Sequence, residues 1–105
     1  MTDREPVDLV ADLVGPDRDA IELRVKFELA RRIALEMEDR GIEIGAAAAL
    51  AGIDAGAVAK IEQGRVMDCS VWLLMRLLAA LGMDVAIEVV PTGREKGTIY
   101  VSEDD

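Results

Sequence analysis

Residues 40–64 read RGIEIGAAAALAGIDAGAVAKIEQG, and this stretch decides the fold. Alanine is the best helix former, so we expect a short helix over residues 44–51. Gly52 suits the left-handed conformation that follows a helix, and Asp54 is a favourable N-cap for a second helix that begins at Ala55. Two short helices joined by a three-residue turn containing glycine make a helix-turn-helix arrangement. The central stretch therefore predicts this motif and a mainly α fold.

A longer helix is predicted upstream, over about residues 19–39. Asp19, followed by Glu22 three residues later, is typical of a capping box at a helix start. Apolar residues then recur at spacings of three and four and form one stripe: Phe27, Ala30, Ile33, Ala34 and Met37. We expect this stripe to be the face that the helix buries.

A further helix is predicted downstream, over residues 71–81, with Ser70 as its N-cap and Gly82 as its stop. Beyond it, the alternating β-branched residues of 84–91 predict a strand, and residues 98–101 predict a second one. These two strands are expected either to form an internal hairpin or to pair across a two-fold axis.

The charge is unevenly distributed over the three segments into which the chain divides. The segments are an acidic arm or short helix at 1–16, a helix-turn-helix domain at 17–83, and a strand or hairpin with an acidic tail at 84–105. The net charge is 12 − 21 = −9, of which the first segment holds −3 and the last holds −4. Because the middle segment is close to neutral, the net charge does not exclude contact with nucleic-acid phosphates.

Composition excludes several chemistries. The chain has 105 residues, enough for one domain, with no His and a single Cys, Cys69. It therefore lacks the residues for a Ser-His-Asp triad, an imidazole metal ligand or an internal disulfide. We expect no catalytic residue, no metal site and no cofactor, so an enzyme is the least favoured class. The acidic N-terminus is unlike a signal peptide and the apolar stretch 71–83 is too short to span a bilayer, which predicts a cytoplasmic protein without a membrane partner.

The central stretch, followed by a Ser-capped helix and the sequence Leu-Gly-Met-Asp-Val, resembles the Cro/lambda-repressor-like (XRE-type) helix-turn-helix family. Within that family the similarity is greatest to HigA-like antitoxins, and it covers roughly residues 20–90. The resemblance implies a lambda-repressor-like bundle of four to five helices with a C-terminal β-strand or hairpin, and a role as a DNA-binding transcriptional regulator. The matching framework positions are Arg40, Gly41, Ile42, Ala47, Ala48, Gly52, Ile53, Val58, Ile61, Glu62, Gly64, Ser70, Leu74, Leu77, Leu78, Leu81, Gly82, Asp84, Val85 and Ile87.

Departures from the family pattern fall on the residues that would contact DNA. The resemblance implies Thr-Gln at the start of the first short helix, where Gln contacts phosphate, but this chain has Glu43 and Ile44. The recognition helix opens with small residues, whereas base readout needs hydrogen-bond donors and acceptors. We therefore expect weak or divergent base readout. The candidate DNA-binding residues are Ala55, Gly56, Ala57, Lys60, Gln63 and Arg65.

Two functions from different classes remain open. The first is an antitoxin-like, DNA-binding transcriptional regulator that forms a homodimer through Val85, Ile87 and Val89. The alternative is a degenerate helix-turn-helix module that no longer binds DNA and instead neutralises a basic toxin or supports dimerisation. The acidic ends of the chain suit a basic partner, although solubility alone would explain them equally well.

Overall fold

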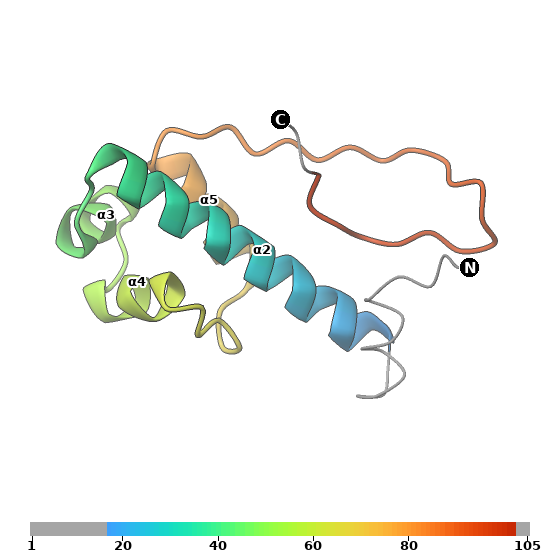
Figure 1. The fold of residues 1–105 in the computed structure, drawn as a ribbon, viewed down its shortest axis with the longest axis horizontal. Coiled ribbons are helices and arrows are strands. Elements are labelled where there is room, and N and C mark those ends of the chain that lie inside the picture. The colour runs from blue at the N-terminus through green and yellow to red at the C-terminus, as the bar shows by residue number, and fades with distance from the viewer. Residues whose placement is uncertain (1–16, 103–105) are drawn as a thin grey trace.

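This computed structural model describes residues 17–102, and this part of the chain contains four helices followed by an extended segment (Figure 1). Their bounds are Asp17–Arg40 for α2, Ile44–Ala51 for α3, Ala55–Glu62 for α4 and Val71–Ala80 for α5. The prediction of a mainly α, helix-turn-helix fold is confirmed. The acidic arm or short helix predicted at 1–16 lies outside the described residues.

Local capping explains where the short helices begin. The Asp54 carboxylate accepts a hydrogen bond from the Ala57 backbone N–H over 3.3 Å, which caps α4. The Ser70 hydroxyl oxygen accepts one from the Leu73 N–H over 3.0 Å, which caps α5. Both predicted N-caps are confirmed. Helix α2 begins at Asp17, earlier than the capping-box pattern indicates.

The turn between α3 and α4 depends on one glycine. Gly52 has φ of 70°, the left-handed region that side chains disfavour, and its N–H donates to the Ala48 oxygen. The Ile53 N–H donates to the same oxygen over 3.1 Å, so the chain reverses within three residues. Helices α3 and α4 are consequently bent by 117° relative to each other.

Within residues 17–102, no single helix is long and apolar enough to cross a membrane. Helices α3 and α4 reach that length and composition only when they are taken together as this bent pair.

The core lies where the four helices meet. Helix α2 packs against α5 and α4, and α3 packs against α4 and α5. The core is aliphatic, because the chain's aromatic residues Phe27, Trp72 and Tyr100 are all exposed. Ala47 and Ala48 are buried, which allows α3 to approach its neighbours closely. The largest side chains that are fully buried are Ile33, Ile61, Leu74, Leu77, Leu81, Val58 and Val66.

The buried face of α2 differs from the predicted stripe in its N-terminal half. Phe27 is 49% exposed, whereas Val25 and Leu29 are buried. Lys26 lies between these two buried positions, and its ammonium donates to the Met67 backbone oxygen over 3.2 Å. Its aliphatic stem is thus buried while its charge finds a polar partner. The predicted stripe is wrong at Phe27 alone, because its other members are buried or partly buried.

The predicted C-terminal strand or hairpin is wrong for the single chain. Residues 84–91 and 98–101 are extended, but no backbone ladder joins them within the described range. The second run packs on the helices instead, because Arg32 donates to the Ser102 backbone oxygen over 2.6 Å and Val101 contacts the core. Figure 1 shows the two runs as an open loop extending beyond the helices.

Replacement of Leu77 with alanine tests the core assignment. Leu77→Ala should lower the free energy of unfolding by about 2–5 kcal/mol, because it removes atoms from a fully buried site on α5. Leu50→Ala is the matched control, since Leu50 is 60% exposed, and should change it by less than about 0.5 kcal/mol. Urea denaturation followed by circular dichroism measures both. Equal losses for the two variants would contradict the assignment.

Candidate nucleic-acid interface

Helix α4 presents one face to the core and the opposite face to solvent. Val58 and Ile61 are fully buried, so the residues between and beside them point outward. All six candidate DNA-binding residues lie on α4 or directly after it. Ala57 is partly buried, and the five exposed ones are Ala55, Gly56, Lys60, Gln63 and Arg65.

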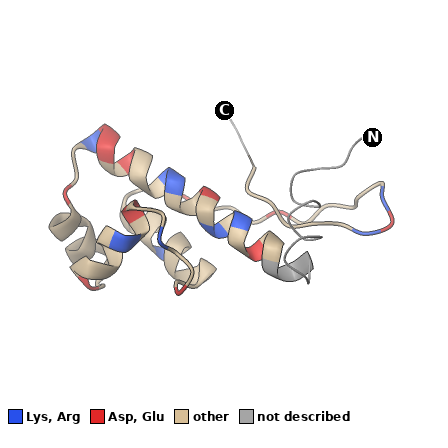
Figure 2. Ribbon diagram, turned by 60° about the horizontal axis from the view of Figure 1, so that its bottom comes forward, with Lys and Arg blue, Asp and Glu red and all other residues tan. Residues whose placement is uncertain are grey.

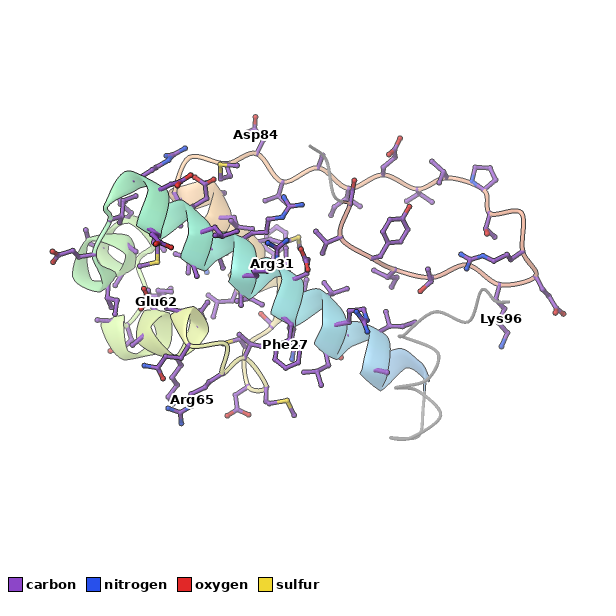
Figure 3. All side chains as sticks on the ribbon, in the orientation of Figure 1. Phe27, Arg31, Glu62, Arg65, Asp84 and Lys96 are labelled. Atoms are coloured by element: carbon purple, nitrogen blue, oxygen red, sulfur yellow. The ribbon has the colours of Figure 1, made fainter. Side chains whose placement is uncertain are left out.

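Polar groups are concentrated at the C-terminal end of this face. Lys60 and Gln63 are the side chains of the exposed face with groups that could reach a phosphate or a base edge. Figure 3 shows the Arg65 side chain pointing away from the helices, beside the end of α4. At the N-terminal end, small residues can contact little beyond a thymine methyl group. The face is therefore suited to contacting the DNA backbone more than to reading bases.

A carboxylate occupies the N-terminus of α4. Asp54 accepts the Ala57 N–H and also crowds Gly56, since a Cβ atom added there would lie 2.8 Å from an Asp54 oxygen. A helix N-terminus otherwise attracts phosphate through its free N–H groups and its dipole. Here the capping carboxylate satisfies one of those groups and places negative charge in front of the helix.

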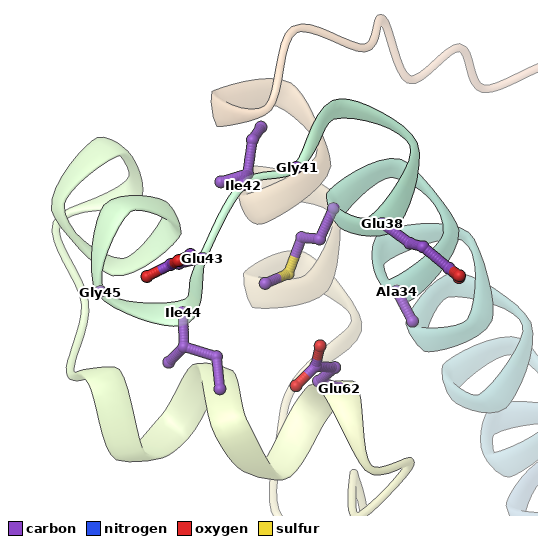
Figure 4. Close-up of a pocket in the computed structure, with 9 residues that line it drawn as sticks. Ala34, Glu38, Gly41, Ile42, Glu43, Ile44, Gly45 and Glu62 are labelled. Carbon is purple, nitrogen blue, oxygen red and sulfur yellow. The ribbon is translucent and has the colours of Figure 1, made fainter.

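An acidic groove lies beside the motif, between the end of α2, the start of α3 and the end of α4 (Figure 4). The open groove has a volume of about 720 Å³. Three carboxylates line it, those of Glu38, Glu43 and Glu62, around the apolar side chains of Ile42 and Ile44. Glu43 precedes α3 and makes no side-chain capping bond there. The departure from the family pattern at Glu43 is visible in the sequence, but only the fold brings these three carboxylates to one groove.

Three arginines of α2 are engaged within the protein. Arg32 binds the Ser102 oxygen, Arg40 donates to the Leu81 oxygen and pairs with Glu36 at 3.2 Å, and Arg31 pairs with Glu28. Figure 2 shows bases and acids interspersed along this helix. These cations stabilise tertiary contacts or balance neighbouring acids. The positive charge beside the exposed face of α4 comes from Lys60 and Arg65.

Lys26 positions the loop that follows α4, a role that the sequence analysis missed. Its bond to the Met67 oxygen ties residues 65–69 to α2, and Glu22 balances its charge at 3.5 Å. The Arg65 N–H donates to the Lys60 oxygen over 2.8 Å, which continues the loop directly from α4. The Glu22 and Lys26 spacing of four residues was the available signal for the ion pair, but nothing local in the sequence indicated the loop contact.

The predicted dimer-interface residues lie elsewhere, on the extended run after α5. Val85, Ile87 and Val89 are exposed there, and Figure 1 shows that run and α4 on opposite sides of α2.

Within residues 17–102, no three Cys, Asp or Glu residues gather where they could hold a metal ion.

The bent pair α3 and α4, supported by α2 and α5, defines a helix-turn-helix protein of the class that binds DNA. A family model described as a helix-turn-helix domain matches residues 9–90, and the chain belongs to that family. A solved structure described as an XRE family transcriptional regulator is similar at 30% sequence identity with a TM-score of 0.71, covering 83% of this chain and 98% of that one. The predicted XRE-type class is thereby confirmed. No curated protein matches the sequence.

Removal of one groove carboxylate tests the electrostatics of this face. Glu43→Gln should strengthen binding to duplex DNA about two- to threefold, because a charge about 8 Å from a phosphate repels it by roughly 0.5 kcal/mol in water. Glu95→Gln, in the exposed turn at residues 93–96, makes the same change of charge far from α4. Fluorescence titration of a labelled duplex at low salt measures both. An equal effect of the two variants would show that total charge matters and the position of Glu43 does not.

Proposed function

We propose that this protein is an antitoxin-like transcriptional regulator that binds DNA through α4 as a homodimer, with weak or divergent base readout. The observation that carries the proposal is the exposed face of α4. It stands clear of the other helices and ends in three residues able to contact phosphate or base edges, Lys60, Gln63 and Arg65. The family membership supports binding to DNA, and the composition of this face supports the limited readout.

The weakness of base readout follows from the residues at the N-terminal end of α4. In related motifs this end reaches the base edges. Ala55, Gly56 and Ala57 supply no side-chain donor or acceptor there. Each good bidentate contact to a base contributes roughly 1–3 kcal/mol of discrimination, so their absence leaves affinity dominated by the phosphates. Binding should accordingly be steeply salt-dependent and tolerant of sequence changes.

A homodimer would compensate for the weak DNA affinity of a single α4 face. Two α4 helices spaced by about one turn of the duplex, roughly 34 Å, would contact two half-sites and combine their weak affinities. The exposed apolar residues Val85, Ile87 and Val89 are the proposed contact between copies.

Neutralisation of a basic toxin is the second candidate function. The acidic groove of Glu38, Glu43 and Glu62 favours it, together with the net charge of −9. Charge complementarity would speed association with a basic partner. Co-expression with the product of the neighbouring gene tests this function, because a toxin should co-purify. If it does so and no DNA binding is found, the protein-contact function replaces the regulator.

Removal of the cations beside α4 tests DNA binding directly. Lys60→Ala and Arg65→Ala should each weaken binding to the protein's own promoter region about tenfold at low salt, a loss of about 1.4 kcal/mol. Each should also reduce the slope of log affinity against log salt by about 0.9. Electrophoretic shift and fluorescence titration measure these changes.

Lys96→Ala is the matched control, since it removes the same charge from an exposed turn distant from α4. Its affinity and salt slope should stay close to those of the unmodified chain. A lack of salt-sensitive binding up to micromolar protein in the unmodified chain would overturn the regulator function.

A further inference from the structure

The C-terminal arm, residues 84–102, is held at both ends and unpaired along its length (Figure 1). Before the arm, the Arg40 guanidinium donates to the Leu81 backbone oxygen, and at its far end Arg32 donates to the Ser102 backbone oxygen. Within the described chain, no hydrogen bond between two backbone groups joins the arm to itself or to the helices. The fold therefore fixes the position of an extended segment whose hydrogen-bonding edges are open.

The residues just before the arm are held by Arg40, the last residue of α2. Gly82 has φ of 95°, and a Cβ atom there would lie 2.8 Å from the Arg40 guanidinium nitrogen. That guanidinium also contacts the Met83 sulfur at 3.8 Å. The positive φ favours glycine at this position, and the absence of a side chain leaves room for the arginine at the end of α5.

Apolar side chains alternate along the first run of the arm. Val85 is 37% exposed, Ile87 is 75% exposed and Val89 is 91% exposed. In an extended chain, alternate residues point to the same side, so these three form one apolar stripe. An unpaired strand edge with exposed apolar side chains is a template for pairing with another strand.

We propose that residues 84–90 of two copies pair as antiparallel strands about a two-fold axis at Ile87, an arrangement that rests on the homodimer proposed above. Directly opposite residues in an antiparallel pair point to the same face. A two-fold axis perpendicular to the sheet must therefore pass between one residue and its own copy. With Ile87 as that residue, Val85 lies opposite Val89 of the second copy, and six apolar side chains share one face.

Charge selects this register over its neighbours. An axis at Ala86 would place Asp84 opposite Glu88 of the second copy. An axis at Glu88 would place two Glu88 carboxylates opposite each other. Like charges directly opposite destabilise a strand pair. The axis at Ile87 avoids both, because Glu88 then lies opposite Ala86 and Asp84 lies opposite Val90.

Pro91 selects the hydrogen-bonding pattern. In antiparallel strands, residues that exchange backbone hydrogen bonds alternate with residues that do not. Pro91 follows directly on the paired run and has no N–H to donate, so we place it in the second group, together with the other odd-numbered residues, including Ile87. Ala86 and Glu88 then exchange the backbone bonds. Side chains approach most closely at the positions without these bonds, and those positions are the apolar ones here.

A second copy suits the arm because residues 84–90 are complementary to themselves. One sequence supplies both halves of the apolar face, and no two carboxylates lie directly opposite each other. The run contains Asp84 and Glu88 and no base, so a strand from a basic protein is the competing occupant. Figure 1 shows the arm and α4 on opposite sides of α2, so pairing of two arms would leave both α4 faces open for DNA.

Cysteine cross-linking of the full chain tests the register. The single cysteine, Cys69, is first removed by Cys69→Ser, and all further variants are made in that background. Ile87→Cys should then form a disulfide-linked dimer on oxidation, because opposite Cα atoms at such a position are about 4.5 Å apart. Glu88→Cys is the matched control and should not cross-link, since its two copies would be about 8 Å apart, beyond disulfide reach. A mixture of Val85→Cys and Val89→Cys should cross-link, whereas either alone should not.

Sedimentation of the unmodified chain distinguishes a wrong strand register from the absence of a homodimer. A dimer that cross-links through Glu88→Cys, and not through Ile87→Cys, would overturn the register and keep the homodimer. A chain that sediments as a monomer, and dimerises with no variant, would overturn both. A monomer whose arm becomes protected only with a basic partner protein would assign the arm to that partner and overturn this proposal.

Ile87→Asp provides a second readout that does not depend on oxidation. Its two copies would place carboxylates opposite each other, so the dimer Kd should rise about 100-fold, or tenfold for each copy. Ile87 is exposed in the single chain, so helix content and thermal unfolding of the monomer should be unchanged. An unchanged Kd would overturn the proposal.

Discussion

The close approach of α3 to its neighbours is the constraint on which the rest of the structure depends. Ala47 and Ala48 are buried where α3 packs against α4 and α5, and larger side chains there would force the helices apart. Gly52 adds the left-handed residue that lets the chain turn within three residues. Together they set the 117° bend that directs Val58 and Ile61 of α4 into the core and leaves the opposite face in solvent.

An acid-rich chain can retain a DNA-binding fold because its charges are divided among different tasks. Three arginines of α2 hold the arm or pair with neighbouring acids, while Lys60 lies on the exposed face of α4 and Arg65 follows directly after it. The groove carboxylates repel phosphate beside the end of α4, and the Asp54 carboxylate does so at its start. This distribution of charge favours weak, salt-sensitive binding to DNA. A dimer can compensate for the low affinity of each copy by contacting two half-sites at once.

The sequence predicted the features that depend on neighbours along the chain. The N-caps at Asp54 and Ser70 and the left-handed Gly52 are governed by hydrogen bonds and backbone strain within three or four residues, and all were recognisable. The burial of Lys26 was not recognisable, because a charged residue normally indicates solvent exposure. Its ammonium is satisfied by the backbone oxygen of Met67, a residue distant in the sequence that only the fold brings close. Phe27 was predicted to be buried but is exposed, because Val25 and Leu29 are the residues that this part of α2 buries.

By itself, the sequence determined the helix-turn-helix and placed the candidate DNA contacts on one helix, since helical periodicity and capping are local properties. Tertiary structure decided which charges remain available for DNA and what the C-terminal run does. Alternation of β-branched residues in 84–91 predicts a strand, but a strand exists only with a partner edge. The contacts of Arg32 and Val101 draw the second run onto α2, so the hairpin does not close and the first run keeps its edges open.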